Sequence, residues 1–569
     1  YNAGTPDAMI RPRELLIGQN SGPSALPADA QPGDGRLVHG FGRIGADRIR
    51  AGGFDDVSLM ARDLLTFDGD VDLGARCSLS LLQGALGNTT AGASVRLAAP
   101  YVLLGGRTVL TPDVALPVSA TLDNWTASRQ PGASLLRVDA EQIDIRNFVR
   151  SGMYGEVKLN GGVSQIVDRR GYEQVALRSR GDLRFLPASA KAAVPIGGLG
   201  DQVSAIMTNG DLLLSAQRIY PATGSVGLAV AGYLSPSAYD PARTLRVERI
   251  DGPLTAAAPL SVFGTLMLIA PTVAQGGALY APLGRIHLGA PREDITRSVR
   301  LLPGSLTSVS AKGLTIPYGG TVDGLSYQYD GTPILAISPG GKAATGSMIY
   351  GVTLEGQSFK VDPGAVIDLS GGGLLTGAAF ISGRGGSTDP LYHPLPRFNQ
   401  ASGTFELPAL AANPVYAILP GLADRYAPVT PQDSASGYAG TRPQAGETIT
   451  IGAGVPGLAA GTYTLLPSYY ALLPGAFRVE LGADNPLAFA PLGLRGGSWT
   501  VAGTRGLGYA GTGDAVPRQV LVTPGDVLRR HAQYNEMDYQ SYTLANAART
   551  GKPRAMLPAD TANMELIFR

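Results

Sequence analysis

The hydrophobic and polar positions of this chain repeat over an eight-residue unit, apolar-x-apolar-x-Ala-x-x-apolar. The unit occurs at residues 57–64, 95–102, 136–143, 212–219 and 266–273. A chain this rich in Val, Ile, Leu and Ala would give roughly one match by chance, so five matches are a signal. In an extended strand the first, third and fifth positions share one face, and the step of three to the last apolar position requires a corner. We therefore predict that each copy forms one wall of a coil in a β-solenoid.

The same parity predicts which side chains face the core. The fifth position is an alanine in every copy, and we expect these alanines to be buried at tight corners: Ala61, Ala99, Ala140, Ala216 and Ala270. The second and fourth positions should face solvent, and in the early copies they are mostly polar or small, with Met60 as the exception. In the later copies they include Leu213, Met267 and Ile269, which a solvated wall avoids. We predict that this part of the wall is covered, either by the excursion within 374–481 or by a neighbouring chain.

Changes of texture along the chain predict six regions. Residues 36–300 alternate between short strands and Gly, Asp or Asn turns, which indicates the solenoid body, and residues 1–35 form a lead-in segment. Connecting strands and further solenoid coils follow at 301–373. A Pro/Gly/Tyr-rich excursion at 374–448 then leads to a β-rich accessory unit at 449–526. Residues 527–569 are predicted to form a short helix, within 527–548, and to return to the solenoid at 564–568.

The strands of the solenoid are predicted to be parallel. Antiparallel hairpins would need two-residue turn signals between every pair of strands, and these signals are infrequent in the sequence. Glycine (77 residues) and proline (42 residues) are abundant, which favours short strands and turns over long helices. The predicted fold class is therefore all-β.

Composition also limits the function. Charged residues make up only 16% of the chain and the net charge is +1, so little counterion release is available to drive nucleic-acid binding. We expect the basic pair Arg529-Arg530 to be solvated surface. The lone cysteine, Cys77, cannot form an intramolecular disulfide, and its parity with Leu79 and Leu81 predicts a buried small apolar residue.

Processing signals are absent from the sequence. No apolar run is long enough to span a bilayer, and no cleavable signal sequence is visible. The chain begins at Tyr1 without an initiator Met, and residues 566–569 look like the middle of a strand. We expect the chain to be a processed or excised part of a longer polypeptide.

Several motifs occur in an order that is typical of one family. They are a Gly-Phe/Tyr-x-x-Val-x-Leu repeat at 53–59 and 171–177, the segments 277–289 and 308–324, the run Ile-Asp-Leu-Ser-Gly-Gly-Gly at 367–373, and the segment 453–481. In this order they resemble the filamentous-haemagglutinin-like large exoproteins of Gram-negative bacteria. The resemblance covers most of the chain.

That resemblance implies a right-handed parallel β-helix (β-solenoid) with β-rich extra-helical excursions. It also implies a two-partner secretion adhesin, exported through an outer-membrane transporter to the extracellular cell surface. We therefore expect a structural and adhesive segment of a large secreted filament of the adhesin or biofilm-matrix type. Its expected partners are copies of itself or other filament subunits, surface glycans, or a host or bacterial cell surface. The family's amino-terminal secretion domain is missing from these residues, so export by this route rests on the resemblance alone.

Two other functions stay open. Parallel β-helices include carbohydrate-active enzymes whose acid/base carboxylates sit on neighbouring coils, and the sequence does not exclude an Asp or Glu pair arranged in that way. The other rival is the stalk of a contact-dependent toxin whose active part lies outside these residues. A glycan-degradation assay separates the enzyme from the adhesin.

Three groups of residues could bind an ion, and for each the sequence favours a structural role. The carboxylates of Asp68-Gly69-Asp70-Val71-Asp72 alternate as in a calcium loop but lack its distal bidentate Glu, so we predict a turn. The glycine-rich segment Gly383-Arg384-Gly385-Gly386-Ser387 lacks the strand-then-helix context of a phosphate loop, and we predict a flexible turn there as well. The histidines are too widely separated for a zinc site: His39, His287, His393 and His531.

We expect His287 to face outward from its strand. No residue is predicted to be catalytic, cofactor-binding or metal-binding. The sequence therefore predicts a protein without enzymatic activity and without a cofactor.

Overall fold

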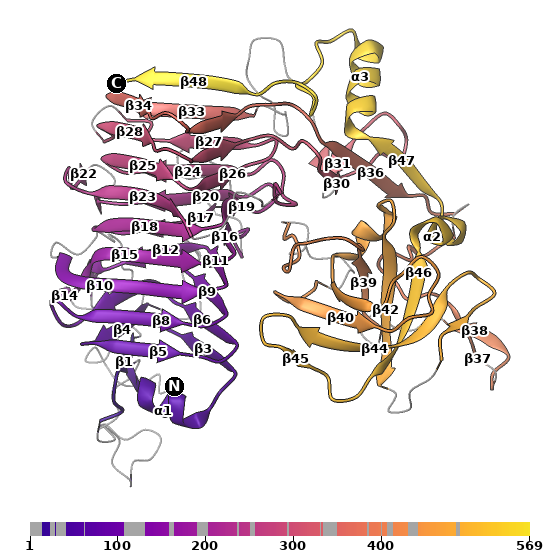
Figure 1. The fold of residues 1–569 in the computed structure, drawn as a ribbon, viewed down its shortest axis with the longest axis horizontal. Coiled ribbons are helices and arrows are strands. Elements are labelled where there is room, and N and C mark those ends of the chain that lie inside the picture. The colour runs from indigo at the N-terminus through magenta and orange to yellow at the C-terminus, as the bar shows by residue number, and fades with distance from the viewer. Residues whose placement is uncertain are drawn as a thin grey trace.

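The computed structural model describes residues 14–22, 29, 41–61, 63–106, 131–158, 164–189, 203–235, 238–250, 257–292, 295–329, 332–333, 350–383, 386–399, 401–406, 413–430, 442–484 and 490–569. Three long parallel sheets form the walls of a solenoid, and a smaller β-rich unit lies beside it (Figure 1). The all-β parallel β-helix predicted from the sequence is therefore confirmed.

The sheets are named A, B and C, and their strands are given in the order in which they pair. Sheet A is β2 (Phe41–Gly45), β1 (Glu14–Gly18), β4 (Leu64–Asp68), β7 (Ala85–Asn88), β12 (Phe148–Ser151), β17 (Val203–Met207), β20 (Val226–Val230), β24 (Thr265–Ile269), β27 (Arg285–Leu288), β33 (Gly351–Gly356) and β48 (Asn563–Phe568). Sheet B is β3 (Asp56–Met60), β6 (Ser78–Leu82), β9 (Tyr101–Gly105), β11 (Gln142–Arg146), β16 (Asp182–Phe185), β19 (Arg218–Pro221), β26 (Ala278–Tyr280), β29 (Leu306–Ser308) and β35 (Val366–Asp368). Sheet C is β5 (Val71–Gly74), β8 (Ser94–Ala98), β10 (Pro131–Ala140), β15 (Gly171–Ser179), β18 (Asp211–Ala216), β23 (Thr244–Arg249), β25 (Thr272–Gly276), β28 (Ser298–Leu301) and β34 (Ser358–Val361).

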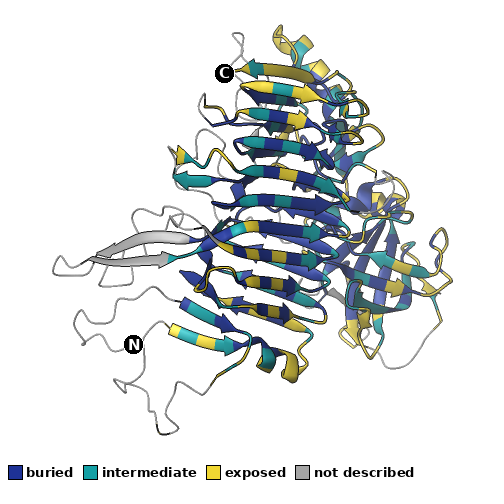
Figure 2. Ribbon diagram, turned by 60° about the vertical axis from the view of Figure 1, so that its left-hand side comes forward, coloured by how far each residue is buried: buried dark blue, intermediate teal, exposed yellow. Residues whose placement is uncertain are grey.

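Each regular coil visits the sheets in the order A, C, B, as β4, β5 and β6 do before β7 returns to sheet A. At about 4.8 Å between stacked strands, the eleven strands of sheet A give a stack on the order of 50 Å long. Buried positions alternate with more accessible ones along several strands, such as β3, β5 and β8 (Figure 2), whereas β16, β19 and β20 are buried at every position. This alternation is the period-two pattern that one solvated face and one core face produce.

The repeated hydrophobic unit marks the core as predicted. Every first, third, fifth and eighth residue of the five copies is buried, with Ala61 the most accessible of them at 8%. The copies do not, however, occupy the same wall. Those at 95, 136 and 212 turn from sheet C into sheet B, whereas those at 57 and 266 turn from B into A and from A into C. The unit therefore specifies a strand followed by a corner, and any of the three corners can use it.

The solenoid begins before the body predicted at 36–300, and it continues into the region 301–373, where further coils were predicted. β1, inside the segment expected to be a lead-in, lies within sheet A and pairs with both β2 and β4. Beyond residue 300 the coil β33, β34, β35 completes the stack before the chain leaves it, and β48 returns to pair with β33. The predicted return at 564–568 is confirmed. At the opposite end, helix α1 (Ala46–Gly52) buries Ala46 and Ile49 in the solenoid core.

Short hairpins leave the stack or extend the smaller unit. They are β13 (Met153–Lys158) with β14 (Ser164–Arg169), β21 (Tyr233–Ser235) with β22 (Ala238–Tyr239), β31 (Gln328–Tyr329) with β32 (Thr332–Pro333), and β37 (Arg397–Asn399) with β38 (Thr404–Glu406).

Two strands carry the chain away from the solenoid and back, and we call their sheet the neck. It consists of β30 (Thr315–Pro317), β36 (Leu374–Phe380) and β47 (Tyr534–Asp538). The rings of Tyr318 and Tyr329 stack beside it with their centroids 4.1 Å apart, and the ring centroids of Tyr327 and Tyr542 are 5.1 Å apart. Because both crossing strands are paired and packed with aromatic rings, the neck is a fixed connection.

Between β36 and β47, residues 386–533 form what we call the side module. Its sheet contains β39 (Val415–Ile418), β40 (Glu447–Ile451), β41 (Gly461–Thr464), β42 (Phe477–Asp484), β43 (Leu492–Gly493), β44 (Trp499–Leu507), β45 (Thr512–Gly513) and β46 (Arg518–Pro524). The 3-10 helix η2 (Ser468–Leu472) and helix α2 (Gly525–His531) accompany the sheet. The β-rich unit predicted at 449–526 thus begins earlier, at β39.

The single helix predicted within 527–548 is wrong. The structure has two helices there, α2 and α3 (Tyr539–Thr550), separated by β47. The interruption occurs because residues 534–538 pair antiparallel with β36 instead of continuing the helix. Asp538 then caps α3, since its carboxylate accepts a 2.8 Å hydrogen bond from the Ser541 backbone N–H.

The apolar outward residues near Met267 are covered, but by a different part of the chain than predicted. Met267 is 4% exposed and lies in a cluster on the outer face of sheet A. Among the described residues of that cluster none belongs to 374–481, and Tyr233 and Tyr239 of the β21–β22 hairpin pack against it. Leu213, on sheet C, stays half-buried. The solenoid's own hairpin therefore supplies cover that was expected from the excursion or from a neighbouring chain.

Candidate functional sites: a neck pocket and a charged joint

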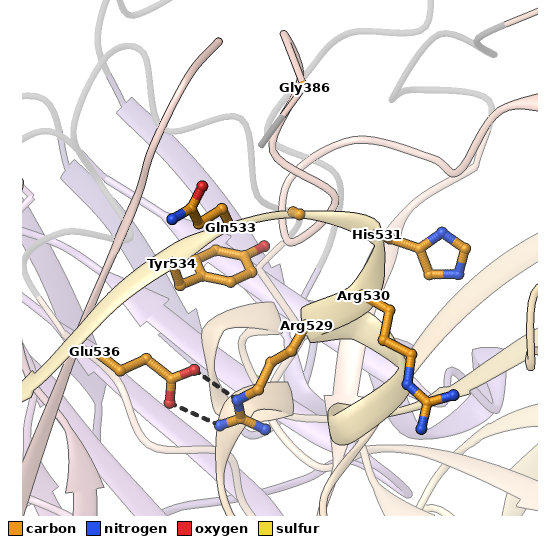
Figure 3. Close-up of a pocket in the computed structure, with 8 residues that line it drawn as sticks. Gly386, Arg529, Arg530, His531, Gln533, Tyr534 and Glu536 are labelled. Atoms are coloured by element: carbon orange, nitrogen blue, oxygen red, sulfur yellow. Dashed lines mark hydrogen bonds and ion pairs between the residues drawn. The ribbon is translucent and has the colours of Figure 1, made fainter. Parts of the chain in front are cut away.

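A pocket of about 390 Å³ lies where α2 runs into β47 (Figure 3). Its lining consists of Gly386, Arg529, Arg530, His531, Ala532, Gln533, Tyr534 and Glu536. Arg529 donates to both oxygens of Glu536, at 2.6 and 2.9 Å, and to the Leu472 carbonyl at 2.6 Å. The Tyr534 hydroxyl donates to Asp389 at 2.6 Å. The pocket is of ligand size. Arg529 and Glu536 are paired with each other, whereas the exposed Arg530 lies 3.9 Å from Asp526, outside the lining.

The second site begins as a ladder of polar residues on the outer face of sheet B. In β11, β16 and β19 the alternating residues Ile143, Leu183 and Ile219 point inward and are fully buried. The residues between them therefore point outward. The strand register places them in pairs across neighbouring coils: Asp144 opposite Arg184, Arg184 opposite Tyr220, and Asp182 opposite Arg218.

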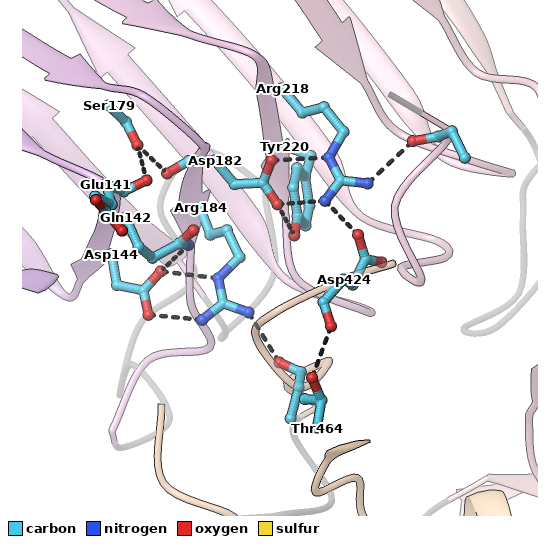
Figure 4. Close-up of polar contacts among 12 residues, drawn as sticks. Glu141, Gln142, Asp144, Ser179, Asp182, Arg184, Arg218, Tyr220, Asp424 and Thr464 are labelled. Atoms are coloured by element: carbon cyan, nitrogen blue, oxygen red, sulfur yellow. Dashed lines mark hydrogen bonds and ion pairs between the residues drawn. The ribbon is translucent and has the colours of Figure 1, made fainter. Parts of the chain in front are cut away.

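These neighbours are joined by bidentate ion pairs (Figure 4). Arg184 donates from Nε and Nη2 to the two oxygens of Asp144, both at 2.8 Å. Arg218 donates in the same way to Asp182, at 2.8 and 2.6 Å. Parallel N–H donors of a guanidinium match the two oxygens of a carboxylate, which makes such pairs short and directional.

The side module closes over this ladder. Arg184 Nη1 donates to the Ala427 carbonyl at 2.9 Å, and Arg218 Nη2 donates to the Asp424 carboxylate at 2.6 Å. The Arg184 guanidinium also lies 5.7 Å from the ring centre of Tyr426. We call Asp144, Asp182, Arg184, Arg218, Tyr220 and Asp424 the charged joint, because this set fastens the module to the solenoid.

A stack of tyrosines extends the contact toward the N-terminal coils. Tyr101 on β9 lies 6.2 Å from Tyr426 and 5.6 Å from Tyr509, and all three rings are near parallel. The Tyr101 hydroxyl also donates to Asp144 at 3.0 Å, so the stack and the ion pairs share one interface. Aromatic stacking of this kind adds about 0.5–1.5 kcal/mol per pair beyond the area buried.

Solvent is excluded from one pair of the joint, whereas the Asp424 side chain is 20% exposed. The side chains of Asp144 and Arg184 are 1% and 3% exposed. The remaining cavity, about 10 Å³ between Tyr220, Leu260 and Val429, holds at most one water molecule. The joint therefore has no room for a substrate.

Burial and pairing shift the pKa values of Asp144, Tyr101 and Tyr220 from their ordinary values. Burial alone would raise the pKa of Asp144, but the charge and hydrogen bonds of Arg184 outweigh burial and hold that pKa below its ordinary value. Burial raises the pKa of the Tyr101 and Tyr220 hydroxyls well above their ordinary value. The joint is a buried network of ion pairs and hydrogen bonds that links the side module to the solenoid.

The candidates singled out in the sequence are dispersed over the structure. Asp68, Asp70 and Asp72 surround the β4–β5 turn, where Gly69 has a φ of 75°. Each carboxylate has its own partners: Asp68 binds Arg43 and Thr89, Asp70 accepts from the Ser94 N–H, and Asp72 pairs with Arg50 and Arg96. The turn predicted for this stretch is confirmed.

The histidines stay apart from one another. The His287 ring faces outward from β27 and its Nε2 lies 2.9 Å from Glu355, while His531 contacts the Gly496 carbonyl at 3.2 Å. The backbone carbonyl of His393 accepts from Arg478, and its backbone N–H donates to the Asp389 carbonyl. His39 lies outside the described residues. Across the part of the chain that the structure describes, no three His, Cys, Asp or Glu side chains are grouped to hold a metal ion.

The remaining candidates have structural environments. Cys77 is buried, as predicted, and burial raises the pKa of its thiol. In the segment 383–387, residues 384 and 385 lie outside the described residues, and Gly383 forms an isolated antiparallel bridge with Gly386. Arg530 is exposed, but Arg529 is held by Glu536, so only half of that basic pair is free surface.

The charged joint was not found from the sequence. Its only signal is the motif polar-apolar-polar-apolar at 142–145, 182–185 and 218–221, with opposite charges at positions that stack once the coil register is known.

Within the described residues, no helix is both long and apolar enough to cross a membrane. Comparison of the chain with protein-family models, with curated proteins and with solved structures gave no match in any of the three.

Proposed function

We propose that this chain is a structural and adhesive segment of a large secreted surface filament. In this proposal the solenoid supplies stiff length, and the side module supplies the surface that contacts a ligand on a host or bacterial cell. The observation that carries the proposal is the charged joint, because it fastens a separate β-sheet unit to the flank of a rod without forming a catalytic centre. An adhesin that bears a pulling force needs its binding unit to stay attached to the rod, and buried ion pairs provide such an attachment.

Secretion is part of the same proposal. We infer export through an outer-membrane two-partner secretion transporter and an extracellular location, on the resemblance of the sequence motifs to filamentous-haemagglutinin-like exoproteins. Self-association of the rods, with copies of the same chain, is its second part. Surface glycans are the ligand class that suits the polar, ligand-sized pocket beside α2.

A binding experiment tests the adhesive role. Fluorescently labelled chain is incubated with bacterial cells, epithelial cells and isolated surface polysaccharide, and the release of reducing ends is measured in parallel. Saturable binding without polysaccharide cleavage is the expected result. Cleavage would replace the adhesin with a carbohydrate-active enzyme, and the absence of both binding and cleavage would contradict the proposal.

A pair of variants tests whether attachment of the module matters. Arg184→Ala removes the central cation of the charged joint. Arg180→Ala, on the same coil as Arg184, removes a solvent-exposed pair with Glu141 of the preceding coil. Binding should weaken in Arg184→Ala and stay unchanged in Arg180→Ala. Equal binding by the two variants would mean that adhesion does not depend on how the module is held.

A further inference from the structure

The pocket beside α2 has a wall that is held in place before any ligand binds. It lies where α2 ends and β47 begins, and β47 is paired along its whole length with β36 of the neck (Figure 3). Its volume of about 390 Å³ is within the range of small-ligand sites and suits a mono- or disaccharide. A site of this kind loses little conformational entropy when it is filled.

One arginine of the pocket is part of its wall. Arg529 Nε and Nη2 donate to the two oxygens of Glu536, Nη1 donates to the Gly525 carbonyl at 3.2 Å, and Nη2 also donates to the Leu472 carbonyl at 2.6 Å. Every nitrogen of this guanidinium is therefore engaged within the protein. Because its charge is balanced by Glu536, the pair adds no net charge to the pocket.

The next residue is a cation that a ligand can reach. The Arg530 side chain is 77% exposed, and Asp526, its carboxylate neighbour at 3.9 Å, is 72% exposed and lies outside the lining. An exposed pair one helical turn apart is held weakly, so a ligand can displace it. Among the described lining residues, the charge of Arg530 is thus the one that Glu536 leaves unbalanced.

Neutral groups beside this cation suit the rest of a sugar. Gln533 is exposed, and its backbone carbonyl accepts from the Ile381 N–H at 2.9 Å, which holds the residue in place and leaves its side-chain amide for hydroxyl groups. The Tyr534 hydroxyl is fixed by its 2.6 Å hydrogen bond to Asp389, and Ala532 is 5% exposed. The pocket therefore combines a polar edge with an apolar wall, as a sugar ring combines hydroxyl groups with a C–H face.

We propose that this pocket binds a sugar that carries one carboxylate, such as a uronic or sialic acid unit of a surface polysaccharide. The Arg530 guanidinium donates to both carboxylate oxygens, a match of two parallel donors with two acceptors. The Gln533 amide binds hydroxyl groups, and the Tyr534 ring packs against the C–H face.

The charge of the site selects among sugars. A neutral sugar leaves the charge of Arg530 unused, and a densely sulfated chain brings more negative charge than one unbalanced arginine can neutralise. This inference rests on the glycan-binding part of the proposed function, for which it names the ligand class and the residues.

Isothermal titration calorimetry with matched sugars tests the charge requirement. The probes are trigalacturonate with its methyl ester, and sialyllactose with lactose, so each acid has a neutral counterpart. At least one acid should bind, with an affinity at least about 10-fold above that of its counterpart. The acid that binds identifies the class of sugar.

Two variants assign the charge to one residue. Arg530→Gln removes the charge and keeps a polar side chain, and Arg180→Gln is the matched control, since Arg180 is 74% exposed, pairs with Glu141 at 3.2 Å and lies outside the pocket. Arg530→Gln should weaken binding of the acid at least about 10-fold, and Arg180→Gln should leave it unchanged. Both side chains are largely exposed, so circular dichroism should show both variants folded.

Equal affinity for an acid and its neutral counterpart, equal losses in the two variants, or no binding of either acid would each overturn the inference. Cell binding separates this inference from the proposed adhesion. An Arg530→Gln chain that loses the acid but still binds cells would support the inference and place adhesion on another surface. A chain that binds the acid through Arg530 but binds no cell would contradict adhesion alone.

Discussion

Asp144 and Arg184 lie on neighbouring strands of sheet B and share two 2.8 Å hydrogen bonds in a place that solvent does not reach. The third nitrogen of the guanidinium, Nη1, donates to the Ala427 carbonyl in the side module. One side chain therefore joins two coils of the solenoid to a segment more than 240 residues further along the chain. Removing it deprives the Ala427 carbonyl of this donor and leaves the buried Asp144 carboxylate without its counter-charge, with hydrogen bonds from Tyr101 and Gln142 remaining.

Arg184→Ala is expected to destabilise the attachment of the side module by about 3–5 kcal/mol, the usual cost of breaking a buried ion pair from one side. Arg180→Ala should cost less than about 1 kcal/mol, because the Arg180–Glu141 pair is exposed. Limited proteolysis of the segment 424–430 measures the difference. Equal cleavage rates in the two variants would show that the joint does not hold the module.

Attachment of the module should also depend on pH in the acid range. Arg184 lowers the folded-state pKa of Asp144, so this group contributes stability above the ordinary carboxyl pKa of about 4 and loses that contribution as the pH falls through its folded value. We expect the melting temperature to fall below about pH 4. The fall should be less steep in Asp144→Asn, which has no carboxylate to protonate. Parallel curves for the two proteins would contradict the assignment.

The assignment of inward and outward side chains can be tested at the corner that Ala140 occupies. Ala140 is 6% exposed and faces inward, while Arg137, three residues earlier, faces solvent and pairs with Asp139 at 2.9 Å. Ala140→Glu should lower the free energy of unfolding by at least about 3 kcal/mol, because it overpacks the corner and buries an unpaired charge. Arg137→Glu should cost about 1 kcal/mol or less. Similar losses in urea unfolding would mean that the parity is wrong.

Close stacking of the coils can be tested at glycines. Gly289 has a φ of 110°, and a Cβ placed there would overlap the Glu355 carbonyl on the next coil. Gly304 also has a positive φ, 74°, but a Cβ there meets nothing within 4 Å. Gly304→Ala should cost about 1–2 kcal/mol from backbone strain alone, and Gly289→Ala should cost at least about 2 kcal/mol more, because the backbone must move. Equal midpoints of urea unfolding would rule out the tight contact.

The sequence contained enough information to predict the core but not the register of the coils. Ala99, Ala140 and Ala216 mark corners because a small residue at fixed parity is a local feature. Which coil lies on which depends on the residues between coils, and these vary: the β13–β14 hairpin, for example, lies between β12 and β15. Without that register, Asp144 and Arg184 are two outward charges 40 residues apart with no visible relation.

The helix error has the same origin. Residues 527–548 are locally compatible with one helix, and only the distant strand β36 draws residues 534–538 into a sheet. Asp424 and Ala427 were also beyond prediction, since they come from a segment without any period. Local periodicity fixes walls and corners, whereas contacts between the solenoid and the side module are set by tertiary packing.

The central claim is that the side module is held in one position on the flank of the solenoid. Spin labels at Arg297→Cys on the solenoid and Thr512→Cys in the module, in a Cys77→Ala background, allow the distance between them to be measured by double electron–electron resonance. A single narrow distance distribution that persists in Arg180→Ala and broadens in Arg184→Ala is the predicted result. A broad or multiple distribution with the charged joint intact would contradict the claim.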